Sequence, residues 1–487
     1  MKKILFLHLL LVFVAFSCRK EQYLAPGISG VGSDTIVLNI GDKIILAPNI
    51  TNLKGNSYTW LMNGNMVATG QLNYNFEAQL PGNFEISFQV SNKAGTDRQT
   101  FNILVEEPIV IANAGPLTIP MCEVVEISPT VAGPDRDDYA YEWLIGDSVI
   151  GKTRNLDFIS PEAGTFELTL RATAGKQTTS ATRTITVETA QYIRNAYTVL
   201  EYAPAPGKFH NWSIVGEKSF WDYGFEHPLP YADFLTKASE LRKTDLSASL
   251  FTGSWGGYAS FKFDHTVANA RDKADVEINA FFSNRDIPAV YVAYDANKNG
   301  NPDEEEWYEI KNDDYGLWDT LYYEITFTYG RTETDARRMY NYYNWIDNKT
   351  EPAQGEIMNA ALLSTAVTTA GIYSTRGLFP GHFMDINTKE VALLDGWKNS
   401  FSRRGKLIKR NLTGAAPFFQ KLNIDIDKAV NEKGESVQLP GIDFVKVRKV
   451  VYPLQQDLST GGVMADYNWE ETRMLQVGSI IDKHLKN

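Results

Sequence analysis

Two stretches in the first part of the chain repeat each other, and this internal repeat is the strongest constraint on the fold. Residues 58–64 (YTWLMNG) correspond to residues 141–147 (YEWLIGD), and residues 81–90 (PGNFEISFQV) correspond to residues 163–172 (AGTFELTLRA). A period of this length means that one small domain occurs twice in succession. The folded part of the chain is therefore expected to begin with two copies of the same unit.

Apolar and polar residues alternate along both copies. The apolar residues are Phe84, Ile86, Phe88 and Val90 in the first copy and Phe166, Leu168, Leu170 and Ala172 in the second. A period of two places successive side chains on opposite faces, so these runs are half-buried strands. Short strands separated by turn residues predict an antiparallel β-sandwich with Trp60 and Trp143 in its core. The alternative, two exposed tryptophan platforms for a ligand, is disfavoured because a tryptophan on an inner strand normally packs into the core.

These motifs resemble those of PKD-like domains, which are immunoglobulin-fold domains of bacterial surface proteins. The resemblance rests on the Y-x-W motif, on the G-x-F-x-[IL]-x-[FL] motif and on a late Ala-Gly pair. It divides this part of the chain into two immunoglobulin-like domains, residues 30–106 and 107–189. The resemblance implies that both domains are spacers that hold a third domain away from the membrane.

The first residues have the pattern of a bacterial export signal. Lys2 and Lys3 are positively charged, residues 4–16 form an apolar run too short to span a bilayer as a helix, and Cys18 follows. A cysteine at that place resembles the lipid-attachment site of bacterial lipoproteins, which implies cleavage of residues 1–17 and lipidation of Cys18. Residues 18–29 would then form a tether to the membrane. The alternative is plain secretion.

Charge and cysteine content narrow the range of functions. The 487 residues carry a net charge of -12 without a basic stripe, which argues against nucleic acid as a partner. Cys122 is the only cysteine after Cys18, so the mature chain cannot form an internal disulfide. Cys122 is expected to be a small buried residue.

From residue 190 onward, strand-like runs are separated by long loops. Strands are predicted at residues 257–264, 275–281, 289–294, 307–310, 322–328, 419–424 and 441–447. Several of these runs alternate, and they are rich in β-branched and aromatic residues. Residues 190–487 are therefore predicted to form a larger β-sandwich of jelly-roll type with long loops. The predicted fold is all-β: two immunoglobulin-like sandwiches followed by the jelly-roll-like sandwich.

A calcium-loop template lies between two of these predicted strands. Residues 295–306 (DANKNGNPDEEE) match the pattern D-x-[DN]-x-[DN]-G-x5-E at every position. The ligand oxygens would come from Asp295, Asn297, Asn299, Asn301 through its carbonyl, Asp303 and Glu306. Strands flank the loop, so we expect a calcium-stapled β-hairpin and not an EF-hand. The alternative is an exposed polar turn without a metal.

Three segments carry candidate ligand-binding residues. These residues are Tyr340, Tyr342, Tyr343, Asn344 and Trp345 in the first segment, Phe379 in the second and Trp397 in the third. Aromatic faces can stack on a sugar ring or a flat cofactor while amide and carboxylate groups bind its polar groups. The alternative for the first segment is a loop that packs over the edge of the sandwich, and for the other two it is an ordinary role in a turn or in packing.

The sequence contains no recognised catalytic motif. The five histidines after Cys18 lack metal-binding spacing, and no nucleophile elbow or phosphate-binding loop is present. A carboxylate pair for glycoside cleavage stays open, because such a pair meets only in the fold. Asp264 and His265 are adjacent, but neighbours on a strand point to opposite faces, so one buried cap and one surface ring are expected. The basic run 403–410 is interpreted as a solvated loop or an edge strand, and the alternative is a site for an anionic partner or a lipid headgroup.

Five further motifs, taken in order, resemble the PKD-domain cell-surface lipoproteins of gut and oral Bacteroidetes. They are residues 200–211, 255–258 with 263–265, 276–281, 294–303 with 306–309, and 441–447. The resemblance implies a lipoprotein of the outer membrane that faces the exterior, often beside a TonB-dependent transporter. We expect a non-catalytic protein that binds a nutrient for uptake, either a glycan or a micronutrient such as a corrinoid. The alternatives are an adhesin or accessory transporter subunit, and a polysaccharide-degrading hydrolase.

Overall fold

The structure is a computed structural model, and part of the chain is described by it. The described residues are 22–30, 32–112, 115–206, 230–253, 255–282, 288–312, 315–330, 342–349, 354–358, 372–374, 381–385, 391–408, 418–450 and 475–486. The chain divides into two compact units. One comprises Met1–Leu117, Ser128–Leu156 and Phe166–Ile185, and the other comprises Thr118–Ile127, Asp157–Thr165 and Thr186–Asn487. The predicted signal segment and Cys18 lie outside the described residues.

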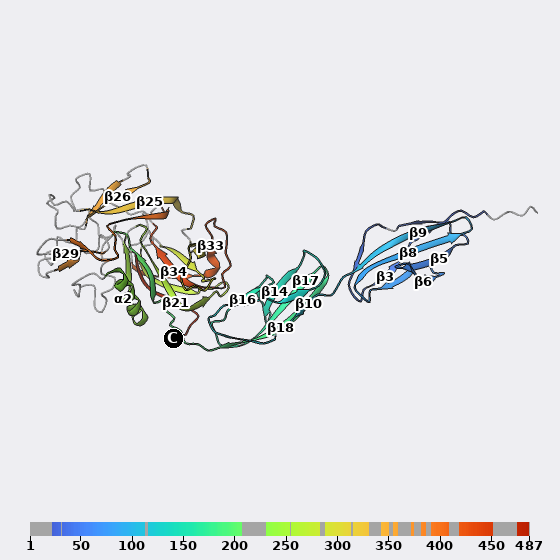
Figure 1. Cartoon of the computed structure of the whole chain (residues 1–487), viewed down its shortest axis with the longest axis horizontal. Coiled ribbons are helices and arrows are strands. Elements are labelled where there is room, and N and C mark those ends of the chain that lie inside the picture. Colours follow the sequence, from blue (N-terminus) through green and yellow to red (C-terminus); the bar gives the residue numbers. More distant parts are fainter. Residues whose placement is uncertain are drawn as a thin grey trace, which may run out of the picture. The chain divides into compact units, whose positions relative to one another are not determined.

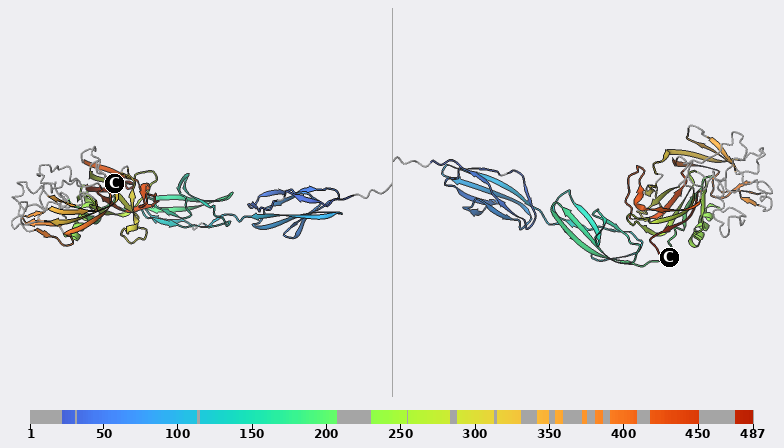
Figure 2. Two further views of the ribbon diagram at one scale, coloured as in Figure 1. Left: turned by 90° about the horizontal axis from the view of Figure 1, so that it is seen from above. Right: turned by 180° about the vertical axis from the view of Figure 1, so that it is seen from behind.

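The first repeat is a two-layer β-sandwich, drawn in blue in Figures 1 and 2. Its larger sheet has the order β2 (Ile36–Leu38), β9 (Gly95–Val105), β8 (Gly82–Asn92), β5 (Ser57–Met62) and β6 (Asn65–Thr69). Two strand pairs complete it, β3 (Lys43–Leu46) with β7 (Tyr74–Glu77) and β1 (Gly27–Ser29) with β4 (Asn49–Thr51). The predicted alternation holds along β8, because Ile86, Phe88 and Val90 are fully buried.

The second repeat has the same strand order. Its larger sheet runs β11 (Leu117–Pro120), β18 (Gln177–Glu188), β17 (Gly164–Ala174), β14 (Ala140–Ile145) and β15 (Ser148–Gly151). The pairs are β12 (Val125–Ile127) with β16 (Leu156–Phe158) and β10 (Val110–Ala112) with β13 (Thr130–Ala132). Every sheet of the first repeat therefore has a counterpart in the second. The prediction of one immunoglobulin-like sandwich in two copies is confirmed.

The two repeats also share the environment of their central tryptophan. Trp60 is fully buried and Trp143 is 2% exposed. The indole nitrogen of Trp60 donates a hydrogen bond to the Gln71 carbonyl (3.1 Å), and that of Trp143 donates one to the Thr153 carbonyl (3.1 Å). In both repeats the strand register shifts directly after the tryptophan. Both residues belong to the core, as predicted, and their one polar atom is satisfied.

Two sheets enclose the main core of the C-terminal domain. The six-stranded sheet has the order β19 (Thr198–Ala203), β21 (Tyr258–Ala268), β34 (Gly441–Arg448), β23 (Ala289–Ala293), β24 (Trp307–Ile310) and β33 (Ala429–Val430). The four-stranded sheet has the order β20 (Leu250–Gly253), β35 (Leu475–Asp482), β22 (Val276–Phe282) and β32 (Phe418–Ile424). Buried residues of both sheets, among them Phe261, Val445, Ile278 and Ile480, form one cluster. This is the predicted jelly-roll-like sandwich.

A further sheet of the C-terminal domain has its own smaller core. Its order is β27 (Gln354–Met358), β26 (Tyr342–Asp347), β25 (Trp318–Gly330) and β31 (Ser400–Ile408), and a three-stranded sheet consists of β28 (Ile372–Ser374), β29 (His382–Asp385) and β30 (Val391–Leu393). With β25, all seven strands predicted after residue 190 are present. The described part of the basic run, residues 403–408, lies in β31 at a sheet edge. The edge-strand interpretation is confirmed, and the solvated loop is wrong.

The sequence analysis did not predict the helix α2 (Tyr231–Thr244), which is labelled in Figure 1. Phe234 and Ala238 of this helix are buried in the main core. Arg242, one turn further on, is also buried, and its guanidinium lies 4.3 Å from the centre of the Phe261 ring. The helix therefore covers the open side of β19, against which it packs. Within the described ranges, no helix has the length and apolar character needed to cross a membrane.

Candidate functional site

The loop 295–306 connects β23 to β24. These strands pair antiparallel, with Tyr291 opposite Glu309 and Ala293 opposite Trp307, so the predicted hairpin is confirmed. Gly300 has a φ of +83°, which is the left-handed conformation that the template needs at this turn. The loop is held to the sheet because Lys262 donates a hydrogen bond from its ammonium to the Gly300 carbonyl (2.7 Å).

The side chains of this loop point toward one another. The Asp303 carboxylate accepts hydrogen bonds from the side-chain amides of Asn297 (2.5 Å) and Asn299 (3.2 Å). The Asp295 carboxylate accepts hydrogen bonds from the backbone N–H groups of Asn299 (2.9 Å) and Gly300 (2.8 Å). The predicted ligands at positions one, three, five and nine are therefore gathered within one small loop.

Two observations bear on whether this loop fits calcium. Rotating the amides of Asn297 and Asn299 by half a turn would direct their oxygens toward the Asp303 carboxylate, which is the oxygen donor set that calcium prefers. However, both oxygens of Glu306 accept backbone N–H groups, from Ala296 and Asp303. Among the described residues, no group of three His, Cys, Asp or Glu side chains is arranged to hold a metal ion. The donors suit calcium, and its binding, including through the Asn301 carbonyl, stays a prediction.

The first predicted ligand segment lies mostly in β26 and not in a loop. Tyr340 falls outside the described residues, as do the side chains of Tyr342 and Tyr343. Asn344 is exposed, but Trp345 is only 5% exposed and packs in the smaller core opposite Phe327. Alternation along β26 turns Trp345 inward, so its ring does not form the exposed platform expected from the sequence.

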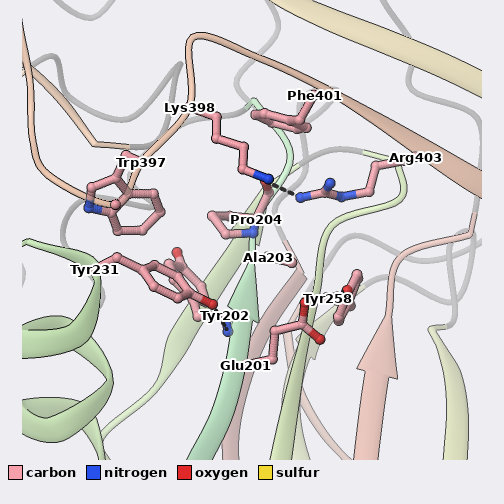
Figure 3. A pocket seen from close by; sticks show the side chains of 11 residues that line it. Glu201, Tyr202, Ala203, Pro204, Tyr231, Tyr258, Trp397, Lys398, Phe401 and Arg403 are labelled. Atoms are coloured by element: carbon pink, nitrogen blue, oxygen red, sulfur yellow. Dashed lines mark hydrogen bonds between the residues drawn. The ribbon is translucent and has the colours of Figure 1, made fainter. Parts of the chain in front are cut away.

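The third predicted segment contributes to a pocket. Its residue Trp397 lines a cavity of about 220 Å³ in the C-terminal domain (Figure 3). Phe379, from the second predicted segment, lies outside the described residues. The cavity is lined by Glu201, Tyr202, Ala203, Pro204, Tyr231, Tyr258, Gly396, Trp397, Lys398, Phe401 and Arg403. These residues come from β19, from α2, from β21, and from β31 with the segment that precedes it. We therefore take this cavity as the candidate binding site.

Two glycines near residues 255–258 bring the backbone segments of the pocket together. A β-carbon on Gly253 would lie 1.8 Å from the Ala205 carbonyl oxygen, and one on Gly257 would lie 1.8 Å from the Thr252 carbonyl oxygen. Both positions therefore require glycine. The close approach allows the Ala205 N–H to donate a hydrogen bond to the Thr252 carbonyl (2.9 Å). It places the segment 201–206 beside Tyr258.

One wall of the pocket is aromatic. The Trp397 ring meets Tyr231 edge-on at 5.2 Å and Tyr202 edge-on at 6.1 Å between ring centres. Tyr202 in turn stacks on Phe234 of α2 at 4.5 Å. Gly381 is needed behind this wall, because a β-carbon there would lie 2.1 Å from Cγ of Trp397. The wall is thus held by packing on several sides, which keeps its shape without a ligand.

Polar groups line another side of the pocket. The Tyr258 hydroxyl donates a hydrogen bond to the Glu201 carboxylate (2.7 Å). Burial and the negative charge of Glu201 both raise the pKa of Tyr258. The Tyr231 hydroxyl accepts a hydrogen bond from the Tyr202 backbone N–H (3.3 Å), and burial raises the pKa of Tyr231. Both hydroxyls are therefore neutral donors and acceptors near pH 7.

Arg403 supplies a half-buried positive charge to the same pocket. Its guanidinium donates a hydrogen bond to the Pro204 carbonyl (3.4 Å) and lies 4.4 Å from the centre of the Phe401 ring. Burial lowers the pKa of Arg403, although an arginine stays protonated near neutral pH. Alternation along β31 turns Arg403 toward the pocket while Arg404 is exposed and pairs with Glu324.

Sequence reasoning did not select most of the residues that line the pocket. It missed Glu201, Tyr202, Tyr231, Tyr258 and Arg403 as site residues. A signal was present, because residues 200–211 and 255–258 are two of the motifs that carry the family resemblance. The pocket forms where these two motifs meet Trp397 and the basic run.

Asp264 and His265 do not line this pocket, and of the two the histidine is buried while the aspartate is exposed. Contrary to expectation, they contact each other: Nδ1 of His265 lies 2.8 Å from Asp264, and Nε2 lies 2.9 Å from Asp482. Burial alternates regularly through this part of β21, so the two residues lie on opposite faces as predicted, but the roles expected of them are reversed. It is the His265 ring that is fully buried, which argues for a structural role. Cys122 is buried and free, as expected.

Comparison with known proteins adds little to this site. No family profile and no curated protein matches the chain. Similar solved structures include an I-band fragment of titin, with 9% identity over 69% of this chain and 98% of that chain and a TM-score of 0.29. A Dscam structure matches with 14% identity over 34% of this chain and a TM-score of 0.23, and the match spans 47% of the Dscam chain, about half its length.

Fibronectin(III)-like modules of CbhA from Clostridium thermocellum match with 14% identity over 34% of this chain and 95% of theirs, at a TM-score of 0.20. TM-scores this low support no conclusion about function. The immunoglobulin-like character of the repeats rests on their own strand order and shared core tryptophan.

Proposed function

We propose that this chain is a non-catalytic surface lipoprotein whose C-terminal domain binds a residue of an extracellular glycan. In this proposal Cys18 carries the lipid anchor in the outer membrane, and the two PKD-like repeats are spacers. The bound glycan would be handed to an uptake system such as a TonB-dependent transporter. The observation that carries the proposal is the pocket, in which an aromatic wall faces hydroxyl, carboxylate and guanidinium groups (Figure 3).

The composition of the pocket suits a sugar. A sugar ring presents an apolar face, which packs on an aromatic side chain, and hydroxyls around its rim, which need polar partners. Trp397 and Tyr231 offer aromatic surface for the apolar face of the ring. Glu201, Tyr258 and Arg403 offer polar partners for its hydroxyls. The aromatic wall is preorganised by its packing, so little conformational entropy is lost on binding.

The size of the pocket favours a glycan over a corrinoid. Its volume of about 220 Å³ is smaller than the roughly 300–1,000 Å³ of pockets that enclose drug-sized ligands. A corrinoid is larger than such ligands, whereas a single sugar residue is smaller. The rest of a bound glycan would extend into solvent.

The pocket residues argue against a hydrolase. Glycoside hydrolysis uses two carboxylates on either side of the scissile bond. Among the described lining residues, Glu201 is the one carboxylate, and it already accepts the Tyr258 hydroxyl. No serine, threonine, cysteine or histidine belongs to the described lining either.

An oligosaccharide array with purified residues 19–487 tests the proposal. We expect binding to a restricted set of glycans, and Trp397→Ala should weaken it by about tenfold or more, because stacking on the ring is lost. Trp318→Ala is the matched control, since Trp318 is 42% exposed and does not line the pocket. Failure to bind any glycan, or equal loss with both variants, would contradict the proposal.

The anchor is tested separately. Growth of an expressing cell with labelled palmitate should label the full chain and not the Cys18→Ser variant. Protease treatment of intact cells should then remove the C-terminal domain if it faces the exterior. An unlabelled, soluble wild-type protein would be evidence against the anchor.

A further inference from the structure

The charge of the pocket is opposite to the charge of the protein. The chain as a whole carries a net charge of -12. The described lining of the pocket has two cations, Lys398 and Arg403, and one carboxylate, Glu201. That carboxylate already accepts a hydrogen bond from the Tyr258 hydroxyl. Figure 3 shows the side chains of Lys398 and Arg403 on the same side of the pocket, above Pro204.

No carboxylate forms an ion pair with Arg403 in the described part of the protein, although the negative charge of Glu201 acts on it. Its hydrogen bonds go to two backbone carbonyl oxygens, those of Pro204 (3.4 Å) and Ser402 (3.1 Å). Its Nε is buried and has no hydrogen-bond partner among the described residues. A half-buried cation without a carboxylate partner is costly, and cations in such places are retained when they meet an anion.

The neighbouring strand adds positive charge behind Arg403. Arg448 of β34 lies opposite Tyr258 in the sheet, and the Lys446 ammonium lies 5.5 Å from the centre of the Tyr258 ring. Burial lowers the pKa of both side chains. The charges of Glu201 and Glu304 act on Lys446 and that of Glu309 acts on Arg448, but none of these carboxylates forms an ion pair with them among the described residues. The nearby Glu309 pairs with Lys406 instead. This strand therefore strengthens the positive potential felt in the pocket.

We propose that the pocket selects an acidic sugar, and that Arg403 binds the carboxylate of a uronic acid residue. This inference rests on the proposed function, since it specifies the class of glycan. A guanidinium presents parallel N–H donors that match the two oxygens of a carboxylate. With the carboxylate on Arg403, the hydroxyls of the ring would meet Glu201 and Tyr258, and its apolar face would meet the aromatic wall.

Calorimetric titration with paired sugars tests this assignment. The probes are the methyl glycosides of D-glucuronic acid and D-glucose, and of D-galacturonic acid and D-galactose. We expect at least one acidic sugar to bind about tenfold more tightly than its neutral counterpart, the range expected for a charge-assisted hydrogen bond. Raising the salt concentration should weaken binding of the acid and leave that of the neutral sugar unchanged.

Matched variants on β31 identify the residue responsible. Arg403→Gln should bring the affinity for the acid down to that for the neutral sugar. Arg404→Gln should leave both affinities unchanged within about twofold, because Arg404 is exposed and pairs with Glu324. Circular dichroism establishes that each variant is folded.

The outcomes separate this inference from the proposed function. Equal binding of acidic and neutral sugars, or a preference for the acid that survives Arg403→Gln, would overturn the assignment. If neutral sugars bind and Trp397→Ala abolishes their binding, the glycan-binding function stands without the acidic preference. If neither sugar of either pair binds and the oligosaccharide array is also negative, both proposals fall.

Discussion

The first repeat and the C-terminal domain differ in the kinds of side chain that they bury. The core of the first repeat consists of apolar side chains around Trp60, whose single polar atom is satisfied. The C-terminal domain buries charged and titratable groups as well. Its buried groups of this kind are Arg242, His265, Asp275, Lys406, Lys449 and Asp482.

This difference indicates where function resides. Apolar burial stabilises a fold directly, whereas a buried charge costs free energy unless a partner compensates it. A spacer domain needs only apolar burial. In the C-terminal domain, several buried charges form ion pairs, but the hydrogen bonds of Arg403 at the pocket go to backbone carbonyl groups alone among the described residues. The domain with the polar interior is thus also the one to which we assign the proposed charged ligand.

The largest effect is expected from the apolar core of the spacer. Trp60→Ala should destabilise the first repeat by about 3–5 kcal/mol, because it leaves a large cavity where the fully buried indole packs. Hydrogen exchange of peptides from each region would measure this locally. Met66→Ala, at a side chain that is 66% exposed, is the control. Glycan affinity should not change, and a loss of affinity would mean that the repeat is more than a spacer.

A slightly smaller effect is expected from the polar core of the C-terminal domain. Asp275 accepts hydrogen bonds from the backbone N–H groups of Ala270 and Ile426 and contacts His484, each at 2.9 Å. Asp275→Ala should cost roughly 3 kcal/mol, since it leaves these buried groups unpaired. Urea unfolding, followed by hydrogen exchange in peptides of the C-terminal domain, would measure this loss of stability. Exposed Asp272→Asn is the control, and a similar loss there would refute the polar-core argument.

Calcium is expected to act on one of the two regions only. At a calcium concentration about five times the dissociation constant, which is roughly 0.1–1 mM for extracellular calcium loops, calcium should stabilise the C-terminal domain by about 1 kcal/mol. A chelator should therefore lower the melting temperature of this domain and leave the first repeat unchanged. Asp295→Ala should remove the sensitivity. If the chelator does not change the melting temperature, the loop is a polar turn without a metal.

The smallest effect is a difference in pH dependence. Hydrogen bonding to Asp275 raises the pKa of His484 above 6.5. Burial alone would lower the pKa of His265, but hydrogen bonds to Asp482 and Asp264 outweigh it and raise that pKa. The stability that these two histidines contribute is full below about pH 6.5 and is lost as pH rises through their raised pKa values.

The first repeat provides the internal reference for this effect, because it contains no histidine. Between pH 6 and 9 the C-terminal domain should lose stability relative to the repeat. Thermal melts across this range measure the difference, and His484→Gln should reduce it. Parallel curves for the two regions would contradict the assignment.

Local patterns were sufficient to predict several strands of this protein, including seven in the C-terminal domain. The alternation along residues 84–90 encodes which side chains of β8 face the core, and the turn residues of the loop 295–306 encode the β23–β24 hairpin. The helix α2 was missed because it lies in an aromatic-rich stretch of a chain whose other elements are strands. Trp345 was misplaced because the sequence does not show whether a short aromatic strand lies at the surface or under another layer.

The sequence by itself determined the all-β fold, the repeated sandwich and its two core tryptophans, because each depends on neighbours separated by two residues or on a visible repeat. Only the tertiary structure decided the pocket, since Glu201, Tyr231, Tyr258 and Trp397 belong to four separate segments. It also decided that His265, and not Asp264, is the buried member of that pair, because its ring meets Asp482 of the last strand. Distances between remote segments follow from how the sheets pack, and a single sequence does not contain them.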